Sequence, residues 1–277
     1  MRWPIEDMCR VLEVSRSGFY AWQKRPLSAR MTEELQVIRP AVRQAFAESR
    51  QTYGCARISA ILDRIGIHIS RKRASGILRT EGLVAKAARR FKHTTDSSHN
   101  HRRSPDLVKR DFTSDRPNRV WVSDFTAIWT LEGWLYVVVF LDLFSRYIVG
   151  WAAGDRMDEG LLVKAFNDAL VKRHPLPGLV AHSDEGGQYF GTFFRGLLSM
   201  LHVKQSMGSS GDCFDNAVNE SFWNTLKTEC FDDTTPPTRQ EAITAIFDYI
   251  ETFYNAKRIH STLGYLSPAE YEMESRT

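Results

Sequence analysis

Two stretches near the N-terminus carry apolar residues at helical spacing, and each contains a residue suited to cap a helix. In the first, a helix begins near Pro4 and Ser15 is placed to cap a second one. In the second, Ser70 is placed to cap a helix that follows a clear apolar stripe. That stripe falls at positions i, i+3, i+4 and i+7, which are Ile58, Ile61, Leu62 and Ile65. The pattern predicts two helical units of the helix-turn-helix type, at residues 1–45 and 46–85.

After Pro117 the pattern changes to short apolar runs that are typical of strands, and helices alternate with them further along. Strands are expected at residues 120–126, 134–142, 146–152, 179–182 and 203–207. Helices are expected at 158–173, at 190–201 and from residue 215 onwards. Three consecutive strands followed by alternating helices and strands are the order of a ribonuclease-H-like α/β core with a mixed five-stranded sheet. The expected core covers residues 116–235, and a helical C-terminal extension covers 236–277.

Between the helical units and the core, periodicity disappears over residues 86–115 while basic residues stay dense. Arg89 and Arg90 belong to this basic run. A polar, basic segment without periodicity is typical of an extended linker, and its cations can lie along a phosphate backbone. We therefore predict a linker that contacts DNA through these two arginines.

Charge divides the 277 residues into two opposed parts. Residues 1–110 hold 23 Lys and Arg against 10 Asp and Glu, a formal charge of +13, while the remaining residues carry −9, for a net charge of +4. A basic N-terminal part indicates an anionic polymer as partner. The sequence has no apolar run of about twenty residues and no signal peptide, and its four cysteines show no metal-binding spacing. These observations predict a cytoplasmic protein without disulfides or a zinc finger.

The second helix of the 46–85 unit carries basic residues away from its apolar face. These residues are Arg71, Lys72, Arg73 and Arg79. A recognition helix presents cations in this way to phosphates and base edges, so they are predicted DNA contacts. The alternative is a solvated helical face that is basic without binding DNA.

Three acidic residues stand where a ribonuclease-H-like core would bring them together. Asp124 lies within the first strand, Asp184 follows the fourth strand, and Glu220 lies in the helix after the fifth. Converging carboxylates repel one another unless cations bind between them, and oxygen ligands suit Mg²⁺ or Mn²⁺ better than zinc. Two such ions are the arrangement that supports in-line phosphoryl transfer. The sequence therefore predicts a two-metal site at these three residues.

Several strings along the chain resemble the DDE transposases of the bacterial insertion-sequence-three family, which are relatives of retroviral integrases. The strings are W-V-S-D-F-T at 121–126, H-S-D-E-G-G-Q-Y at 182–189, D-N-A-V-N-E-S-F-W-N-T-L-K-T-E at 215–229, Y-N-A-K-R-I-H-S-T-L-G-Y-L-S-P-A-E-Y at 254–271 and Y-G-C-A-R-I-S-A-I-L at 53–62. Thirty-five residues separate Asp184 from Glu220, as in that family. The resemblance implies that Asp124, Asp184 and Glu220 bind two metal ions and catalyse strand cleavage and strand transfer at the ends of a mobile element.

The same helix offers two further candidates for DNA contact. Lys227 lies about two helical turns after Glu220, and Asn216 lies one turn before it, so all three share a face. In the integrase relatives the lysine touches the DNA end, which implies the same role here; a solvated surface lysine is the alternative. Arg258 and His260 are open between phosphate binding and a structural role.

The resemblance also implies the binding partners of the chain, and other functions compete with that of a transposase. Double-stranded DNA, both element ends and target, is the expected partner, and the joining of two ends implies a homo-oligomer. Family members are commonly fused to an upstream reading frame, and the lack of a heptad run predicts that this chain is the downstream product. The competing hypotheses are a catalytically silent DNA-end-binding regulator and a structure-specific nuclease of the same fold. Removal of residues 1–85 is expected to abolish end specificity and leave the remainder folded.

Overall fold

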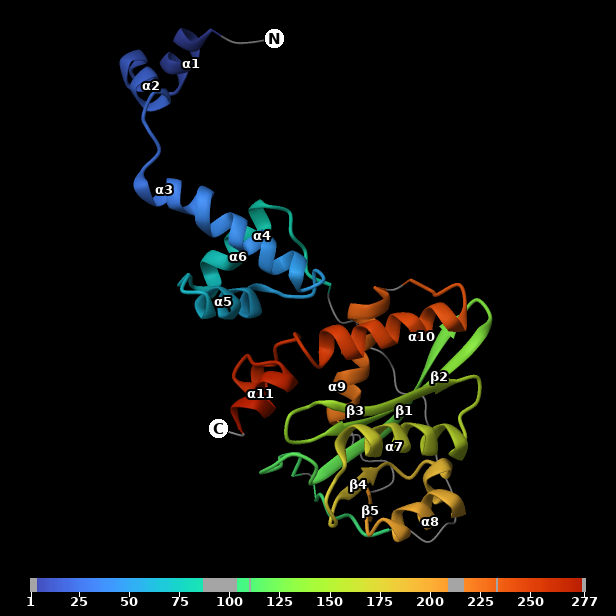
Figure 1. Cartoon of the computed structure of the whole chain (residues 1–277). Helices are drawn as coiled ribbons and strands as arrows, with labels where there is room; N and C mark the ends of the chain where they lie inside the picture. Colours follow the sequence, from blue (N-terminus) through green and yellow to red (C-terminus); the bar gives the residue numbers. More distant parts are fainter. Residues whose placement is uncertain (1–3, 87–103, 110, 209–216, 233, 276–277) are drawn as a thin grey trace.

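The N-terminal residues form two short helices that lie apart from the sheet in the computed structural model (Figure 1). The structure describes residues 4–86, 104–109, 111–208, 217–232 and 234–275. Helix α1 spans Ile5–Val11 and helix α2 spans Arg16–Gln23. The Ser15 hydroxyl accepts a hydrogen bond from the Gly18 amide, so the expected cap is confirmed. Within these two helices the buried side chain is Cys9 alone, and they form a separate small unit.

A long helical rod follows and leads into the second helical unit. It consists of α3 (Ala29–Glu33), the π-helical turn η1 (Glu34–Ile38) and α4 (Arg39–Glu48). Pro40 lacks an amide hydrogen, and the wider π turn directly before α4 accommodates it near the start of that helix. The expected boundary between residues 45 and 46 falls within α4, whose buried side chains pack with those of α5 and α6.

Helices α5 (Cys55–Arg64) and α6 (Arg71–Thr80) form the helix pair that the apolar stripe predicts. Ser70 caps α6 by accepting a hydrogen bond from the Arg73 amide. Gly66 has a positive φ of 81° directly after α5, a conformation that glycine adopts without a Cβ penalty. The local signals at 46–85 therefore act as the sequence indicates.

The part of the chain that follows residue 117 is built on a five-stranded mixed sheet in the described residues, with the order β3-β2-β1-β4-β5. Its strands are β1 (Val120–Thr130), β2 (Gly133–Asp142), β3 (Ile148–Gly154), β4 (Val180–Ser183) and β5 (Lys204–Met207). The first three pair antiparallel, whereas β4 lies parallel to both β1 and β5. This is the expected ribonuclease-H-like arrangement, and the predicted fold class is confirmed.

Two of the strands depart from the expected ranges by more than one residue. β1 continues to Thr130 because its end pairs with β2 through Trp129 opposite Trp134. β3 begins at Ile148, later than expected, because Arg146 takes a positive φ of 62° in the turn before it. Cross-strand pairing and turn geometry set these ends, and neither is visible in the apolar pattern.

Helices cover both faces of the sheet (Figure 1). One face carries α7 (Glu159–Arg173), the 3-10 turn η2 (Gly187–Phe190) and α8 (Thr192–Met200). α7 lies so close to β3 that a Cβ at Gly150 would meet the Ala165 carbonyl oxygen at 2.4 Å. The other face carries the helices that follow β5, which are α9 (Ala217–Leu226), the π turn η4 (Lys227–Phe231), α10 (Arg239–Phe247) and the π turn η5 (Asp248–Tyr254).

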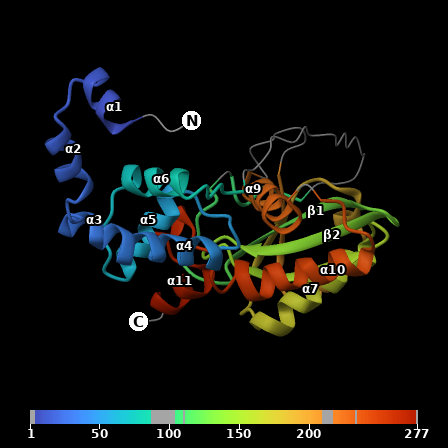
Figure 2. The ribbon, with the colours of Figure 1, turned by 90° about the horizontal axis from the view of Figure 1, so that it is seen from above.

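The C-terminal extension connects the sheet to the second helical unit (Figure 2). After η5 it contains η6 (Ser261–Leu263) and α11 (Pro268–Glu274). Among the contacts that join this extension to the helical unit are the Arg50–Asp248 ion pair at 2.7 Å, the Arg64–Glu270 ion pair at 2.5 Å and the hydrogen bond that the Ile259 amide donates to the Tyr53 hydroxyl at 2.8 Å.

This docking buries apolar side chains of both partners in one cluster. Tyr53 is buried and its ring packs against Phe253 of η5. Removal of residues 1–85 would therefore strip a buried surface from the remainder, which the apolar pattern did not indicate. In the described ranges, no helix is long and apolar enough to cross a membrane.

Candidate active site

Asp124 lies on the face of β1 that α9 covers. Side chains alternate along a strand, and Trp121 packs with the α7 side of the sheet while Val122 packs with the α9 side. Asp124 follows Val122 by two residues and points the same way. Its half-buried carboxylate accepts a hydrogen bond from the Trp223 indole of α9, with Nε1 and Oδ2 2.9 Å apart. The strand period therefore aims this acid at the helix that carries Glu220.

Asp184 directly follows β4, the strand that pairs with β1, although sixty positions separate Asp184 from Asp124 in the sequence. The parallel register pairs Val122 with His182 and Ser123 with Ser183, and β4 ends at Ser183. Asp124 and Asp184 directly follow the last pair of this register, Asp124 within β1 and Asp184 just beyond the end of β4. The parallel pairing of β1 with β4 thus brings the chain positions of two of the three expected ligands to the same end of the sheet.

The surroundings of Asp184 disfavour its charged form. The carboxylate is accessible to solvent, yet packed protein displaces enough water to raise its pKa above the ordinary value, and the charge of Glu185 acts in the same direction. A hydrogen bond from the Gly186 amide, 3.0 Å long, opposes this effect. Within the described residues no lysine or arginine pairs with Asp184, so a bound cation would relieve the cost of its charge.

Tyr189 lies beneath the two acids. Its hydroxyl is 3.0 Å from the Ser123 Oγ on the α7 side of the sheet. Burial raises the pKa of Tyr189 well above its ordinary value, and the charges of Asp184 and Asp124 add to this rise. The tyrosine stays neutral, and its response to both carboxylates places them in one electrostatic environment.

One face of the α9 helix and its π-helical continuation points to Asp124. Glu220, Trp223 and Lys227 fall at i, i+3 and i+7, a single stripe along this face. Burial lowers the pKa of the half-buried Lys227, and the nearby charge of Asp124 raises it in opposition. The stripe therefore brings an indole donor and a cation to Asp124 and carries Glu220 on the same helix face.

The donor set at this site consists of carboxylate oxygens, the chemistry that Mg²⁺ and Mn²⁺ prefer. Asp124 and Asp184 suit such an ion because they follow paired positions of neighbouring strands and because Asp184 lacks a basic partner in the described residues. In the part of the chain that the structure describes, no three His, Cys, Asp or Glu side chains are gathered closely enough to hold an ion. The structure has Asp124 on β1, Asp184 directly after β4 and Glu220 on the adjoining helix α9.

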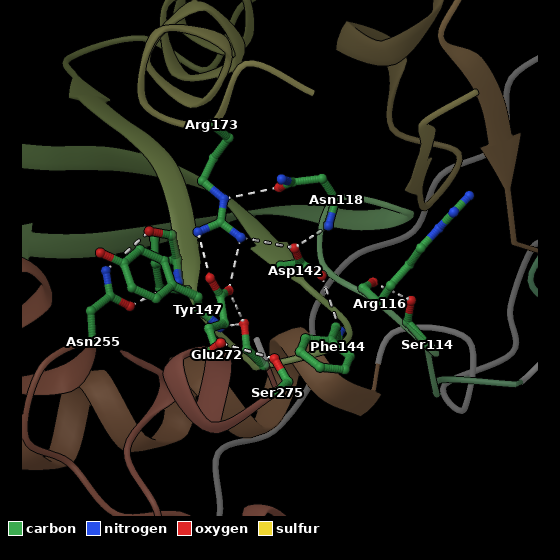
Figure 3. A network of polar contacts seen from close by, with 12 residues as sticks. Ser114, Arg116, Asn118, Asp142, Phe144, Tyr147, Arg173, Asn255, Glu272 and Ser275 are labelled. Atoms are coloured by element: carbon green, nitrogen blue, oxygen red, sulfur yellow. Dashed lines mark hydrogen bonds and ion pairs between the residues drawn. The ribbon is translucent and has the colours of Figure 1, made fainter. Parts of the chain in front are cut away.

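Two buried acids of the core form ion pairs with arginine and differ in this from the solvent-accessible Asp184. Asp142, at the end of β2, pairs with Arg173 at 3.4 Å, and Glu272 pairs with the same guanidinium at 2.8 Å (Figure 3). The Asn118 amide also donates to Asp142 at 2.7 Å. Burial still raises the pKa of Asp142 to about 6. This network is structural, because Arg173 and backbone donors occupy its acids.

The expected DNA-contact residues of α6 fall into two groups. Arg73 forms an ion pair with Glu34 at 3.2 Å, and Arg71 donates to the Tyr265 hydroxyl at 3.2 Å, so both contact the protein itself. Lys72 and Arg79 are exposed. The remaining candidates lie outside the described residues, and they are Arg89, Arg90 and Asn216.

Two residues beside the acids are not predicted by sequence reasoning as parts of the site. Trp223 holds Asp124 through its indole nitrogen, and a signal for it exists, since it follows Glu220 by three helical positions. Tyr189 becomes relevant only through the pairing of β1 with β4, which brings it under Ser123.

Family models match three parts of the chain. Two models, each described as an integrase core domain, match residues 114–213 and 220–275, and an HTH-like domain matches residues 33–91. A chain of the simian T-cell lymphotropic virus intasome structure has a similar fold, with a TM-score of 0.50 and 16% identity over 84% of this chain and 74% of that one.

Curated relatives match the chain over nearly its full length. The transposase InsF for insertion sequence IS3A of Escherichia coli strain K12 is 38% identical over 97% of this chain and 93% of the relative. The transposase for insertion sequence element IS904 of Lactococcus lactis is 40% identical over 86% of this chain and 94% of the relative. The insertion element IS600 31 kDa protein of Shigella sonnei is 40% identical over 95% of this chain and 97% of the relative.

The fold and these matches define a polynucleotidyl transferase with an integrase core and a helix-turn-helix-like domain. The chain belongs to the family of IS3-type insertion-sequence transposases. The resemblance stated from the sequence strings is thereby confirmed, as is the function of a transposase.

Proposed function

We propose that Asp124, Asp184 and Glu220 form the catalytic triad of this transposase and hold two divalent metal ions. The observation that supports the proposal is the register of β1 and β4, whose last pair directly precedes Asp124 and Asp184, together with the lack of a basic partner for Asp184 in the described residues. Glu220 supplies the third carboxylate from α9, whose Trp223 already contacts Asp124.

The chain's own residues give each group a role in phosphoryl transfer. When bound, Mg²⁺ or Mn²⁺ ions activate the attacking oxygen and stabilise the leaving one in an in-line displacement. Trp223 fixes the orientation of the Asp124 carboxylate through its 2.9 Å hydrogen bond. Lys227, on the same helix face as Glu220, donates to a phosphate of the DNA end.

In this function, water first cleaves the strand at the element end and leaves a 3′-hydroxyl. That hydroxyl then attacks a phosphodiester of the target, the P–O bond of the target strand breaks, and no covalent protein intermediate forms. The joining of two ends needs two active sites, so we propose at least a dimer on DNA. Lys72 and Arg79 of α6 are the proposed phosphate or base contacts of the helical unit, together with Arg71 and Arg73. Arg89 and Arg90 of the linker and Asn216, one turn before Glu220, are proposed as further DNA contacts.

The test combines a labelled element end, a target plasmid and Mg²⁺ with the full chain. Asp184→Asn and Glu220→Gln each remove one carboxylate with little change in volume, and we expect both to abolish joined product while leaving end binding intact. Glu241→Gln removes an exposed carboxylate on α10 and serves as the matched control with wild-type activity. Retained joining in either triad variant would overturn the proposal.

The same assay separates the competing functions. A DNA-end-binding regulator gives binding without any reaction, and a structure-specific nuclease gives cleavage without joining. Joined product that requires a divalent cation supports the transposase mechanism proposed here.

A further inference from the structure

A cavity of about 290 Å³ lies where the second helical unit, the turn before β3, α9 and the C-terminal extension meet. Four elements far apart in the sequence contribute to it. Its basic wall consists of Arg57, Arg146, Arg258 and His260, while Ser221 of α9 and Thr262 of η6 bring hydroxyl groups. Among the described residues that line it, none is acidic.

Arg57 and Arg146 enter this cavity without a carboxylate partner in the described residues. The Arg57 guanidinium lies over the Tyr53 ring, 5.4 Å from its centroid. Arg146 donates through Nη2 to the Phe112 carbonyl at 3.1 Å, but its enclosed Nη1 has no hydrogen-bond partner within the described ranges. A buried guanidinium N–H without an acceptor is costly, so this atom is suited to a ligand oxygen.

The field in the cavity repels further cations. Burial lowers the pKa of Arg57, and the charge of Arg258 lowers it further. Burial, together with Arg258, Arg57 and Arg146, lowers the pKa of His260 to about 2, so the imidazole is neutral at physiological pH. Glu229 forms an ion pair with Arg258 from outside the lining, whereas Arg57 and Arg146 form no ion pair in the described residues and feel Glu229 and Asp142 only at longer range.

We propose that this cavity binds a backbone phosphate of the DNA substrate through Arg57 and Arg146. Planar guanidinium forks match phosphate oxygens, and the hydroxyls at the mouth add neutral donors of the kind that contact nucleic-acid backbones. The cavity borders α9 at Ser221, so it lies against the helix that also carries Glu220. This inference rests on the proposed function, in which DNA is the substrate of the site that includes Glu220 of α9.

A contact to a backbone phosphate does not distinguish one base sequence from another, so its loss should weaken the binding of every duplex alike. Arg57→Gln and Arg146→Gln should each weaken binding to a duplex with the terminal repeat and to an unrelated duplex by the same factor, roughly tenfold near 0.1 M salt. Each should also lower the slope of log affinity against log salt concentration by about one. Arg57→Lys keeps the charge and should restore most of the slope.

Arg64→Gln is the matched control, because it lies on α5 two turns from Arg57 but outside the cavity, paired with Glu270. Binding of the full chain to each duplex is measured by fluorescence anisotropy in the presence of a metal chelator, and circular dichroism verifies that each variant is folded. Folded Arg57 and Arg146 variants with an unchanged salt slope would overturn the inference. Loss confined to the terminal-repeat duplex, or altered binding of inorganic phosphate with unaltered DNA binding, would overturn it as well.

The two proposals fail separately. The catalytic proposal is tested by whether the Asp184 and Glu220 variants still form joined product. The phosphate cavity is tested by the affinity for DNA in the presence of a chelator, where no joining occurs. An Arg57 variant that joins slowly but reaches wild-type rates at saturating DNA supports the binding role.

Discussion

The buried ion pair between Glu229 and Arg258 gives the sharpest stability prediction. Glu229 lies in the π turn that continues the α9 helix, and Arg258 lies in the C-terminal extension. Their side chains are 7% and 5% exposed, and the guanidinium binds the carboxylate twice, at 2.7 and 2.8 Å. The Tyr249 hydroxyl donates to the same carboxylate at 2.8 Å. The pair therefore joins the end of the catalytic helix to the segment that closes over it.

Glu229→Gln leaves the Arg258 charge buried without its counter-charge. Burial works to lower the pKa of Arg258, and the hydrogen bonds with Glu229 outweigh it and hold that pKa above its ordinary value. Removal of one partner from such a pair costs about 3–5 kcal/mol in the free energy of unfolding. For a chain of this size, that loss lowers the melting temperature by roughly 6–20 °C.

Urea unfolding followed by tryptophan fluorescence measures this loss. The control is Glu270→Gln, which removes a charge from the Arg64–Glu270 pair, where the side chains are 42% and 37% exposed. Exposed pairs are worth at most about 1 kcal/mol, so the control should change the free energy of unfolding by no more than that. If Glu229→Gln costs as little as the control, the argument that the pair anchors the α9 helix is refuted.

Three further predictions follow from other parts of the structure. The pKa of Asp142 is about 6 in the folded state against an ordinary 3.8, so the folded state takes up this proton first as the pH falls. Relative to Asp142→Asn, the wild type should therefore gain about 1 kcal/mol in the free energy of unfolding when the pH is lowered from 7 to 5, as measured by urea unfolding. A difference between the two proteins that does not depend on pH would contradict this. Deletion of residues 1–28 should move the melting temperature by less than about 2 °C, because α1 and α2 bury few side chains. Deletion of residues 1–85 should lower the melting temperature sharply and expose apolar surface that binds a fluorescent dye. Equal melting curves for both deletions would count against the docking of the helical unit on the C-terminal extension. Trp223→Phe removes the hydrogen bond to Asp124 and should raise the Mg²⁺ concentration for half-maximal joining about 10–100-fold, and an unchanged Mg²⁺ requirement would show that the indole does not orient the acid.

The sequence predicts most local elements because their signals are local. Ser15 and Ser70 cap the helices that they precede, and the apolar stripe of α5 faces the core. The short apolar runs mark all the strands of the sheet, with errors at their ends. The α3–η1–α4 rod is not anticipated, because Pro40 interrupts its helical pattern and a π turn, which leaves no sequence period, resolves the interruption.

The candidate site divides in the same way. The acids stand out in the sequence as polar residues at strand positions and in the strings that resemble the family. Their proximity is decided by the parallel register of β1 with β4, and the orientation of Asp124 by a hydrogen bond from α9. Such contacts join residues that are tens of positions apart, and no periodicity specifies them.

The sequence by itself determined where helices and strands form, the division into a basic N-terminal part and an acidic C-terminal part, and the membership in the transposase family. Only the tertiary structure decided which acids are neutralised by arginine, how the helical unit docks on the C-terminal extension, and where Arg57 and Arg146 converge. The physical reason is that helical and strand periods, caps and net charge are properties of neighbouring residues. Register, burial and the field at a charged group depend on what the folded chain places against them.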